Sequence, residues 1–268
     1  MNTVLINDAH LLAVEEGDAR THPVVFIHGF PFSHAMWQSQ ITAVSRHFRA
    51  IAYDVRGLGG SSVGDGQYTI EGHVDDLIGL LDHLAIPKAV IIGLSMGGYI
   101  ALRALERNPE RWSGAVLCNT RSEADTNEGR IGRAAAISLV KKSGSKAFAD
   151  DFVRKVFAPA SFIRVPDAVE MITGVIARTP PIAIAGTLLA LAARTDTTAS
   201  LSRINVPTLI MVGEHDMTTP PEASRAMHER IPGSELHIVP LAAHMSPLEN
   251  PEFVNTHLLE FLRRSVTP

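Results

Sequence analysis

Six short runs of the chain are apolar at nearly every position, and longer amphipathic segments separate them. A strand that is apolar on both faces must be covered on both faces, as a parallel strand is between two layers of helices. Strands that alternate with helices also favour right-handed crossovers and a doubly wound sheet. The six runs are Val24–Ile27, Ala50–Tyr53, Ala89–Gly93, Ala115–Cys118, Thr208–Val212 and Glu235–Val239.

Two N-terminal segments, Val4–Ile6 and Leu11–Val14, alternate more regularly and predict an antiparallel start to the same sheet. The chain is therefore expected to form a doubly wound, mostly parallel, eight-stranded α/β sheet. Between the strands, apolar residues of Thr69–Leu84 recur three or four positions apart, which indicates a helix with one buried face and Thr69 as its N-cap. Further helices are predicted at Met96–Glu106, Pro221–Arg230 and Pro251–Arg264.

The alternation of strands and helices stops between residues 121 and 200. This stretch is helical in composition and carries a net charge of +3, whereas the whole chain carries −4. We expect residues 121–200 to form a helical cap inserted before the strand Thr208–Val212, and residues 1–120 and 201–268 to form the core. Two interpretations of the charge stay open. Arg121, Arg130 and Arg133 attract an acidic substrate, or they only solvate the outer faces of the helices.

Composition disfavours several classes of function. The chain of 268 residues is long enough to bury a full core, and its single cysteine, Cys118, allows neither an intrachain disulfide nor a CxxC pair. A net charge of −4 disfavours nucleic acid as a partner. The N-terminus lacks the features of a signal peptide, and the longest apolar stretch is too short to span a membrane. We expect a soluble, cytoplasmic monomer or homodimer with no metal or organic cofactor.

The strongest chemical signal is the sequence GLSMGG at residues 93–98, which follows a predicted strand and precedes a predicted helix. This is G-x-S-x-G in the strand–turn–helix context that exposes a nucleophilic serine. Gly93 and Gly97 leave room for the tight turn, so the hydroxyl of Ser95 is expected to stand at the carboxyl end of the sheet. The alternative is a glycine-rich turn without chemistry.

A nucleophilic serine needs a base, and the base needs an acid that orients it. Asp216 follows the strand Thr208–Val212, and His244 follows the strand Glu235–Val239, so Asp216 is predicted as the acid and His244 as the base. His215 is a weaker candidate for the base. Weaker candidates for the acid are Glu123, Asp196 and Glu214. Six other histidines occupy positions typical of a surface, namely His10, His47, His73, His83, His228 and His257.

An oxyanion hole requires two converging backbone N–H groups. Met96 follows the nucleophile and supplies one, and Phe30 in the loop after Val24–Ile27 is expected to supply the other. His28 is expected to hold this loop by hydrogen bonds. Candidate substrate contacts are His28, Phe32, Trp37 and Arg121, although the aromatic residues are equally compatible with the core. Asp54 and Arg56 are expected to tie neighbouring loops together.

Five motifs together make the sequence similar to the α/β-hydrolase superfamily along nearly the whole chain. They are HGF at 28–30, D-x-R-G-x-G-x-S at 54–61, GLSMGG at 93–98, GEHD at 213–216 and AAHM at 242–245. Within the superfamily, GLSMGG and the short cap most resemble the branch of 3-oxoadipate enol-lactonases and small carboxylesterases. Serine at position 95 departs from haloalkane dehalogenases and epoxide hydrolases, which carry aspartate there.

The resemblance implies a serine hydrolase that cleaves a small carboxylic ester or lactone through an acyl-enzyme, without a cofactor. Three alternatives stay open from the sequence: a carbon–carbon bond hydrolase or an amidase with the same triad, and a non-catalytic ligand-binding protein on the same scaffold. Perhydrolase or haloperoxidase side activity, which such relatives also show, is left open as well.

Overall fold

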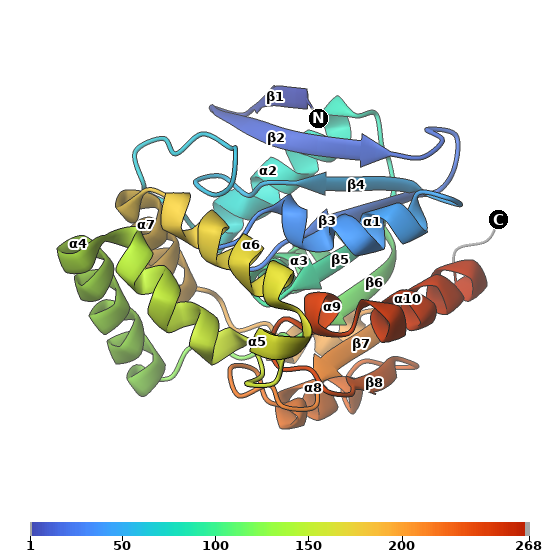
Figure 1. Ribbon diagram of the computed structural model, residues 1–268. Helices are drawn as coiled ribbons and strands as arrows, with labels where there is room; N and C mark the ends of the chain where they lie inside the picture. The colour runs from blue at the N-terminus through green and yellow to red at the C-terminus, as the bar shows by residue number, and fades with distance from the viewer. Residues whose placement is uncertain (1, 266–268) are drawn as a thin grey trace.

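The computed structural model describes residues 2–265, which form one eight-stranded sheet (Figure 1). The strands are β1 (Asn2–Ile6), β2 (Ala9–Glu16), β3 (Pro23–Ile27), β4 (Arg49–Tyr53), β5 (Ala89–Leu94), β6 (Trp112–Cys118), β7 (Thr208–Gly213) and β8 (Glu235–Val239). Their spatial order is β1-β2-β4-β3-β5-β6-β7-β8. The β1–β2 and β2–β4 pairs are antiparallel, and the other pairs are parallel. The predicted fold class is confirmed.

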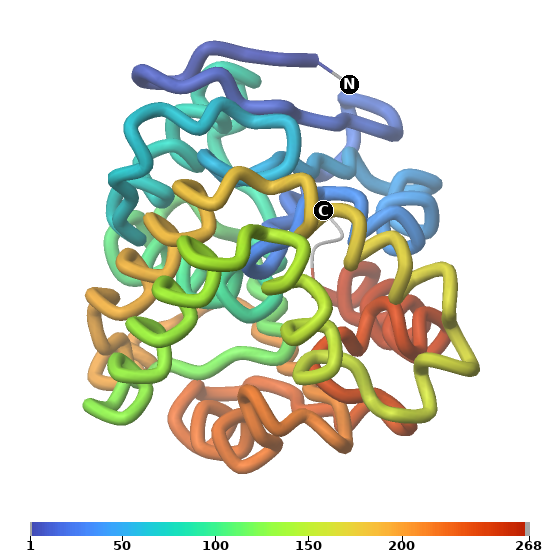
Figure 2. The backbone as a smooth tube through the Cα atoms, turned by 60° about the vertical axis from the view of Figure 1, so that its left-hand side comes forward, coloured from blue at the N-terminus to red at the C-terminus, as the bar shows by residue number. Residues whose placement is uncertain are grey.

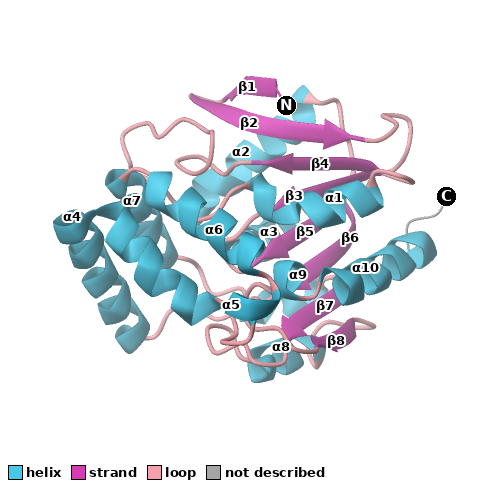
Figure 3. Cartoon of the chain, viewed as in Figure 1, coloured by secondary structure: helices cyan, strands magenta, loops and turns pink. Residues whose placement is uncertain are grey.

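Helices cover both faces of this sheet, as its wholly apolar central strands require (Figure 3). In Figure 1, α1 (Gln38–Val44) and α10 (Pro251–Ser265) lie in front of the sheet, and α2 (Ile70–His83) and α3 (Met96–Arg107) lie behind it. Two shorter helices, α8 (Pro221–His228) and α9 (Ser246–Glu249), flank β8 in the sequence. Short 3₁₀ turns occur at η1 (His34–Trp37), η2 (Pro109–Arg111) and η3 (Thr198–Arg203).

Helix α2 shows how the sequence pattern sets this packing. The side chain of Thr69 accepts a hydrogen bond from the backbone N–H of Gly72, so Thr69 caps the helix as predicted. Val74, Leu77 and Leu81 lie on one face and are fully buried. The burial of this apolar face stabilises the helix on the sheet.

Four helices separate β6 from β7: α4 (Asn127–Val156), α5 (Ser161–Arg164), α6 (Pro166–Arg178) and α7 (Pro181–Ala192). Helix α4 breaks at Gly144, whose φ of 79° is left-handed, and both α6 and α7 pack against α4. Figure 2 shows α4 to α7, called the inserted helices below and coloured green to orange, as one group in front of the sheet. No single helix within residues 2–265 is long and apolar enough to cross a membrane; α6 and α7 pass that test only as a pair, which is bent by 99°.

Candidate active site

Ser95 lies in the tight turn between the central strand β5 and helix α3. Its φ of 54° is left-handed, a strained conformation for a residue with a side chain. A Cβ atom on Gly93 would collide with the carbonyl oxygen of Gly97, and one on Gly97 would collide with that of Ile27. The hydroxyl of Thr120 donates to the Ser95 carbonyl oxygen at 2.9 Å. The turn therefore has the predicted geometry, and the Ser95 side chain is partly exposed.

His244 and Asp216 form a buried pair at the carboxyl ends of β7 and β8. The distance from His244 Nδ1 to Asp216 Oδ2 is 2.8 Å, and the two residues are 2% and 1% exposed. Asp216 Oδ1 also accepts hydrogen bonds from the backbone N–H groups of Thr218 and Thr219, at 2.8 and 3.0 Å. The structure thus brings together the two residues predicted as base and acid.

The surroundings of Asp216 keep it ionised. Burial alone would raise the pKa of this carboxyl, but the charge of His244 and the hydrogen bonds from His244, Asn119 and Thr219 outweigh burial and lower the pKa to about 2. Asp216 is therefore a carboxylate at neutral pH, and it can accept a hydrogen bond from the Nδ1–H group of His244.

Ser95 and the His244–Asp216 pair lie at the same, carboxyl-terminal end of the sheet, because β5, β7 and β8 are parallel and each residue follows the carboxyl end of its strand. Among residues 2–265, no hydrogen bond joins the Ser95 hydroxyl to His244. Bonds between a nucleophile and its base are often long before substrate binds. The hydrogen bond between Ser95 and His244 is therefore expected to form when substrate binds.

Asn119 is a site residue that the sequence analysis missed. It follows β6 with a left-handed φ of 47°, and its Nδ2 atom donates to Asp216 Oδ2 at 2.9 Å and to the Ala243 carbonyl oxygen at 3.0 Å. Its Oδ1 atom accepts a hydrogen bond from Ser246. The signal available in the sequence was a polar side chain directly after β6, the strand between β5 and β7, but only carboxylates such as Glu123 were considered as partners of the base.

The backbone N–H groups of Phe30 and Met96 are oriented by a loop and a helix start. Met96 is the first residue of α3, where the N–H groups are unpaired and the helix dipole favours negative charge. In the part of the chain that the structure describes, neither N–H group donates to a protein acceptor. Both are therefore free to donate to a ligand. The Phe30 ring packs against Phe148 and Phe152 of α4, with ring centres 6.3 and 5.9 Å apart.

The candidate substrate contacts lie in different surroundings. His28 is fully buried; its Nε2 atom accepts from the Val55 N–H at 2.9 Å, and its Nδ1 atom donates to the Gly29 carbonyl oxygen at 2.7 Å. Both ring nitrogens of His28 therefore bind backbone, as expected for a residue that holds this loop, and neither is left to bind a substrate.

The two aromatic candidates lie in the core. Trp37 is 1% exposed and packs on Phe26 with ring centres 5.4 Å apart, and Phe32 has no exposed surface. Of the alternatives, their place in the core is the one that the structure supports. Arg121 is partly exposed and donates to the Thr218 carbonyl oxygen at 3.0 Å, two residues beyond Asp216.

Within residues 2–265, none of the weaker candidates for base and acid is hydrogen-bonded to His244. His215 is exposed, and its nearest carboxylate is that of Glu214, at 3.8 Å. Asp196 accepts hydrogen bonds from the backbone N–H groups of Ala124 and Thr198. No group of three or more metal-binding side chains converges within residues 2–265.

Arg56 and Asp54 tie loops together, as expected. Arg56 donates to both carboxylate oxygens of Asp76, at 2.8 and 2.6 Å. Asp54 accepts from the backbone N–H groups of His34 and Gly60, at 2.6 and 2.7 Å. These contacts link the turn after β4 to α2 and to the loop after β3.

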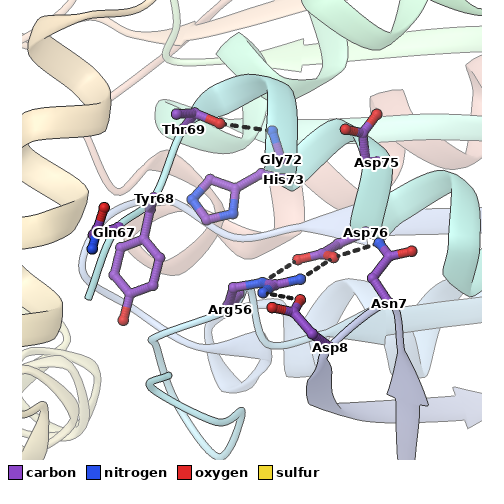
Figure 4. Close-up of a pocket in the computed structure, with 10 residues that line it drawn as sticks. All are labelled: Asn7, Asp8, Arg56, Gln67, Tyr68, Thr69, Gly72, His73, Asp75 and Asp76. Atoms are coloured by element: carbon purple, nitrogen blue, oxygen red, sulfur yellow. Dashed lines mark hydrogen bonds and ion pairs between the residues drawn. The ribbon is translucent and has the colours of Figure 1, made fainter. Parts of the chain in front are cut away.

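A separate polar cavity of about 460 Å³ lies beside the Arg56–Asp76 pair (Figure 4). Figure 4 shows His73 between Tyr68 and that pair. His73 is 2% exposed, so its predicted surface position is wrong: the loop that carries Tyr68 covers it, with ring centres 5.9 Å apart.

Comparison with known proteins finds similar sequences and structures over nearly the whole chain. A sequence model of the alpha/beta hydrolase family matches residues 24–257. The chain is 31% identical to 3-oxoadipate enol-lactonase 2 of Acinetobacter baylyi, over 97% of this chain and 95% of that protein. It is also 31% identical to a putative carbamate hydrolase of Agrobacterium fabrum, over 91% and 94% of the two chains. A thermophilic esterase from Thermogutta terrifontis superposes with a TM-score of 0.92 and 35% identity, covering 97% of this chain and 95% of that one.

Proposed function

Because the chain belongs to the alpha/beta hydrolase family, we propose that it hydrolyses small carboxylic esters or lactones through an acyl-enzyme on Ser95. The observation that carries the proposal is the buried hydrogen bond between His244 and Asp216. It lies at the carboxyl end of the sheet, where Ser95 also lies in its strained turn. An enol-lactonase and an esterase among the similar proteins support the substrate class.

The reaction begins when Ser95 Oγ attacks the substrate carbonyl carbon and His244 Nε2 takes the hydroxyl proton. The carbonyl oxygen becomes an oxyanion, which accepts hydrogen bonds from the N–H groups of Phe30 and Met96. His244 then gives its proton to the departing alkoxide, and the acyl group stays on Ser95. Water activated by His244 releases the acid and restores the hydroxyl.

Asp216 makes His244 competent for this role. The Nδ1–H bond to Asp216 places the lone pair of the neutral ring on Nε2. The charge of Asp216 also stabilises the imidazolium that forms when Ser95 is deprotonated. Asn119 and Thr219 hold the carboxylate in place from other directions.

A second candidate is hydrolysis of a carbamate or amide by the same triad, which the similarity to a putative carbamate hydrolase favours. An amide differs from an ester in its leaving group, an amine that takes the proton from His244, and a carbamate also bears nitrogen at the carbonyl carbon. The attack by Ser95 and the roles of His244 are the same. Turnover of matched esters, enol-lactones, amides, carbamates and 1,3-diketones, compared by kcat/KM, ranks these substrate classes.

The direct test is the Ser95→Ala variant. The control is Ser122→Ala, because the hydroxyl of Ser122 bonds Thr198 and not a residue of the triad. We expect Ser95→Ala to lower kcat/KM for p-nitrophenyl acetate about 10⁴-fold or more, and Ser122→Ala to retain the wild-type value. Near-normal turnover by folded Ser95→Ala would refute the proposal. Ligand binding without turnover of any substrate in the panel would instead support a binding protein.

A further inference from the structure

The loop that carries His244 is held by a buried carboxylate outside the triad. Glu249, in α9, is 1% exposed, and its Oε2 atom accepts the backbone N–H groups of Ala243 and Met245 at 2.8 and 3.1 Å. These are the residues on either side of His244. One carboxylate oxygen therefore fixes the backbone from which the imidazole projects.

The other oxygen of the same carboxylate binds the inserted helices. Glu249 Oε1 accepts the backbone N–H of Ala158 and the hydroxyl of Ser161, both at 2.7 Å. The backbone N–H of His244 itself donates to the Val156 carbonyl oxygen at 3.0 Å. Figure 1 shows α5, which begins at Ser161, beside α9.

Arg164, at the end of α5, adds two hydrogen bonds to the same loop. Its guanidinium donates to the carbonyl oxygen of Leu241 at 2.8 Å and to that of Glu249 at 3.0 Å. The segment from Val156 to Arg164 is thus bonded to the loop before, at and after His244.

We propose that Glu249 is a positioning residue for His244, and that the segment 156–164 of the inserted helices is part of the support of the base. This inference rests on the proposed function, because it takes His244 as the general base. The insertion then contributes to the chemical step, through its hydrogen bonds to the loop of the base.

The physical reason is the match between one acceptor group and four donors. A buried carboxylate is costly unless it is hydrogen-bonded, and here each oxygen receives two hydrogen bonds. A Gln side chain has one acceptor oxygen and one NH₂ group. In Glu249→Gln the NH₂ group therefore faces two hydrogen-bond donors, either those of the inserted helices or those of the His244 loop. The loop must shift to relieve that contact, and a shift of about 1 Å in a catalytic group can cost on the order of 10²-fold in rate.

The experiment compares Glu249→Gln with Asp76→Asn, which alters another buried carboxylate, in α2, that bonds Arg56 and Asn7. We expect Glu249→Gln to lower kcat about 10- to 100-fold and to leave KM within about twofold, because the reacting geometry changes more than substrate binding does. Labelling of Ser95 by a fluorophosphonate should slow by a similar factor. Asp76→Asn should retain the wild-type kcat.

A second variant keeps the test decisive if Glu249→Gln does not fold. Ser161→Ala removes one donor from the inserted helices and leaves the charge and the loop sequence intact. It should lower kcat a few-fold with KM unchanged, since a single hydrogen bond to a charged group is lost.

Unchanged kcat in both Glu249→Gln and Ser161→Ala would overturn the inference, as would an equal loss of kcat in Asp76→Asn. These outcomes require an active wild type. An inactive wild-type protein that is not labelled at Ser95 would contradict the proposed function itself, so the two failures are distinguishable.

Discussion

Asp216 receives hydrogen bonds on both carboxylate oxygens, and His244 is only one of the donors. We predict that Asp216→Asn lowers kcat/KM about 10⁴-fold, because an amide facing Nδ1 favours the tautomer whose Nε2 is already protonated. The measurement is ester hydrolysis at neutral pH by the folded variant, with folding checked by circular dichroism.

Two other acidic residues serve as controls for that change. Glu123 and Asp196 lie between β6 and β7 and do not bond His244. Glu123→Gln and Asp196→Asn should each retain activity within a few-fold of wild type, as is usual for residues outside the reacting site. If Glu123→Gln were the crippling change, the acid would lie after β6 and the assignment of Asp216 would fail.

Single residues also show where prediction from sequence stops. The nucleophile, acid and base could be predicted because each follows a recognisable strand in a set order. Asn119 lies 97 residues from Asp216, and Glu249 reaches Ala158 across 91 residues. Hydrogen bonds between such distant residues depend on how helices and loops pack, which a sequence pattern does not record.

At the scale of elements, α2 shows which features helical periodicity predicts and which depend on packing against other segments. Its apolar stripe predicted the buried face correctly. His73 adjoins that stripe, and it became buried because the loop with Tyr68 and the turn with Arg56 close over it. Helical periodicity describes one element at a time, so burial by a neighbouring loop was not predicted.

The burial of His73 gives a prediction for stability. Burial lowers the pKa of this imidazole to about 4; the nearby Asp76 opposes that shift and Arg56 adds to it. The His73 imidazole therefore takes up a proton near pH 6.5 in the unfolded chain but only near pH 4 in the folded chain. The free energy of unfolding falls as the pH drops from 6.5 toward 4. Between pH 7 and pH 5, wild type should lose roughly 2 kcal/mol more unfolding free energy than His73→Gln.

Urea unfolding at the two pH values measures this difference. The comparison between wild type and His73→Gln removes the contribution of other buried histidines such as His28, whose pKa is also lowered by burial. Equal losses in the two proteins would show that His73 takes up its proton in the folded state.

On the scale of the whole molecule, the order of elements was readable from the sequence because parallel strands need helices between them. Boundaries moved by one to three residues: β5 runs to Leu94 rather than Gly93, and β6 begins at Trp112 rather than Ala115. The contacts of the inserted helices were not readable. The rings of Phe148 and Phe152 meet Phe30, and α5 meets the His244 loop, although nothing in the helical composition of residues 121–200 specifies either contact.

These contacts bear on substrate size. A cavity of about 380 Å³ within the inserted helices is lined in part by Phe148, Phe152, Leu139 and Leu188. Neither Ser95 nor His244 lines this cavity, so the argument on substrate size rests on the rings of Phe148 and Phe152, which line it and also pack against Phe30 beside the proposed oxyanion hole. We predict that acetyl and butyryl p-nitrophenyl esters have far higher kcat/KM than decanoyl or longer esters. A maximum at ten carbons or more would indicate an open, lipase-like groove.

Covalent labelling tests the central claim most directly, because a fluorophosphonate reacts with a serine only where a base and an oxyanion hole activate it. We predict one adduct per chain, located on Ser95 by mass spectrometry of the peptides, with loss of ester hydrolysis in proportion to labelling. Ser95→Ala should take up no label. An adduct on another residue, or a wild-type protein that hydrolyses esters while Ser95 stays unlabelled, would contradict the account.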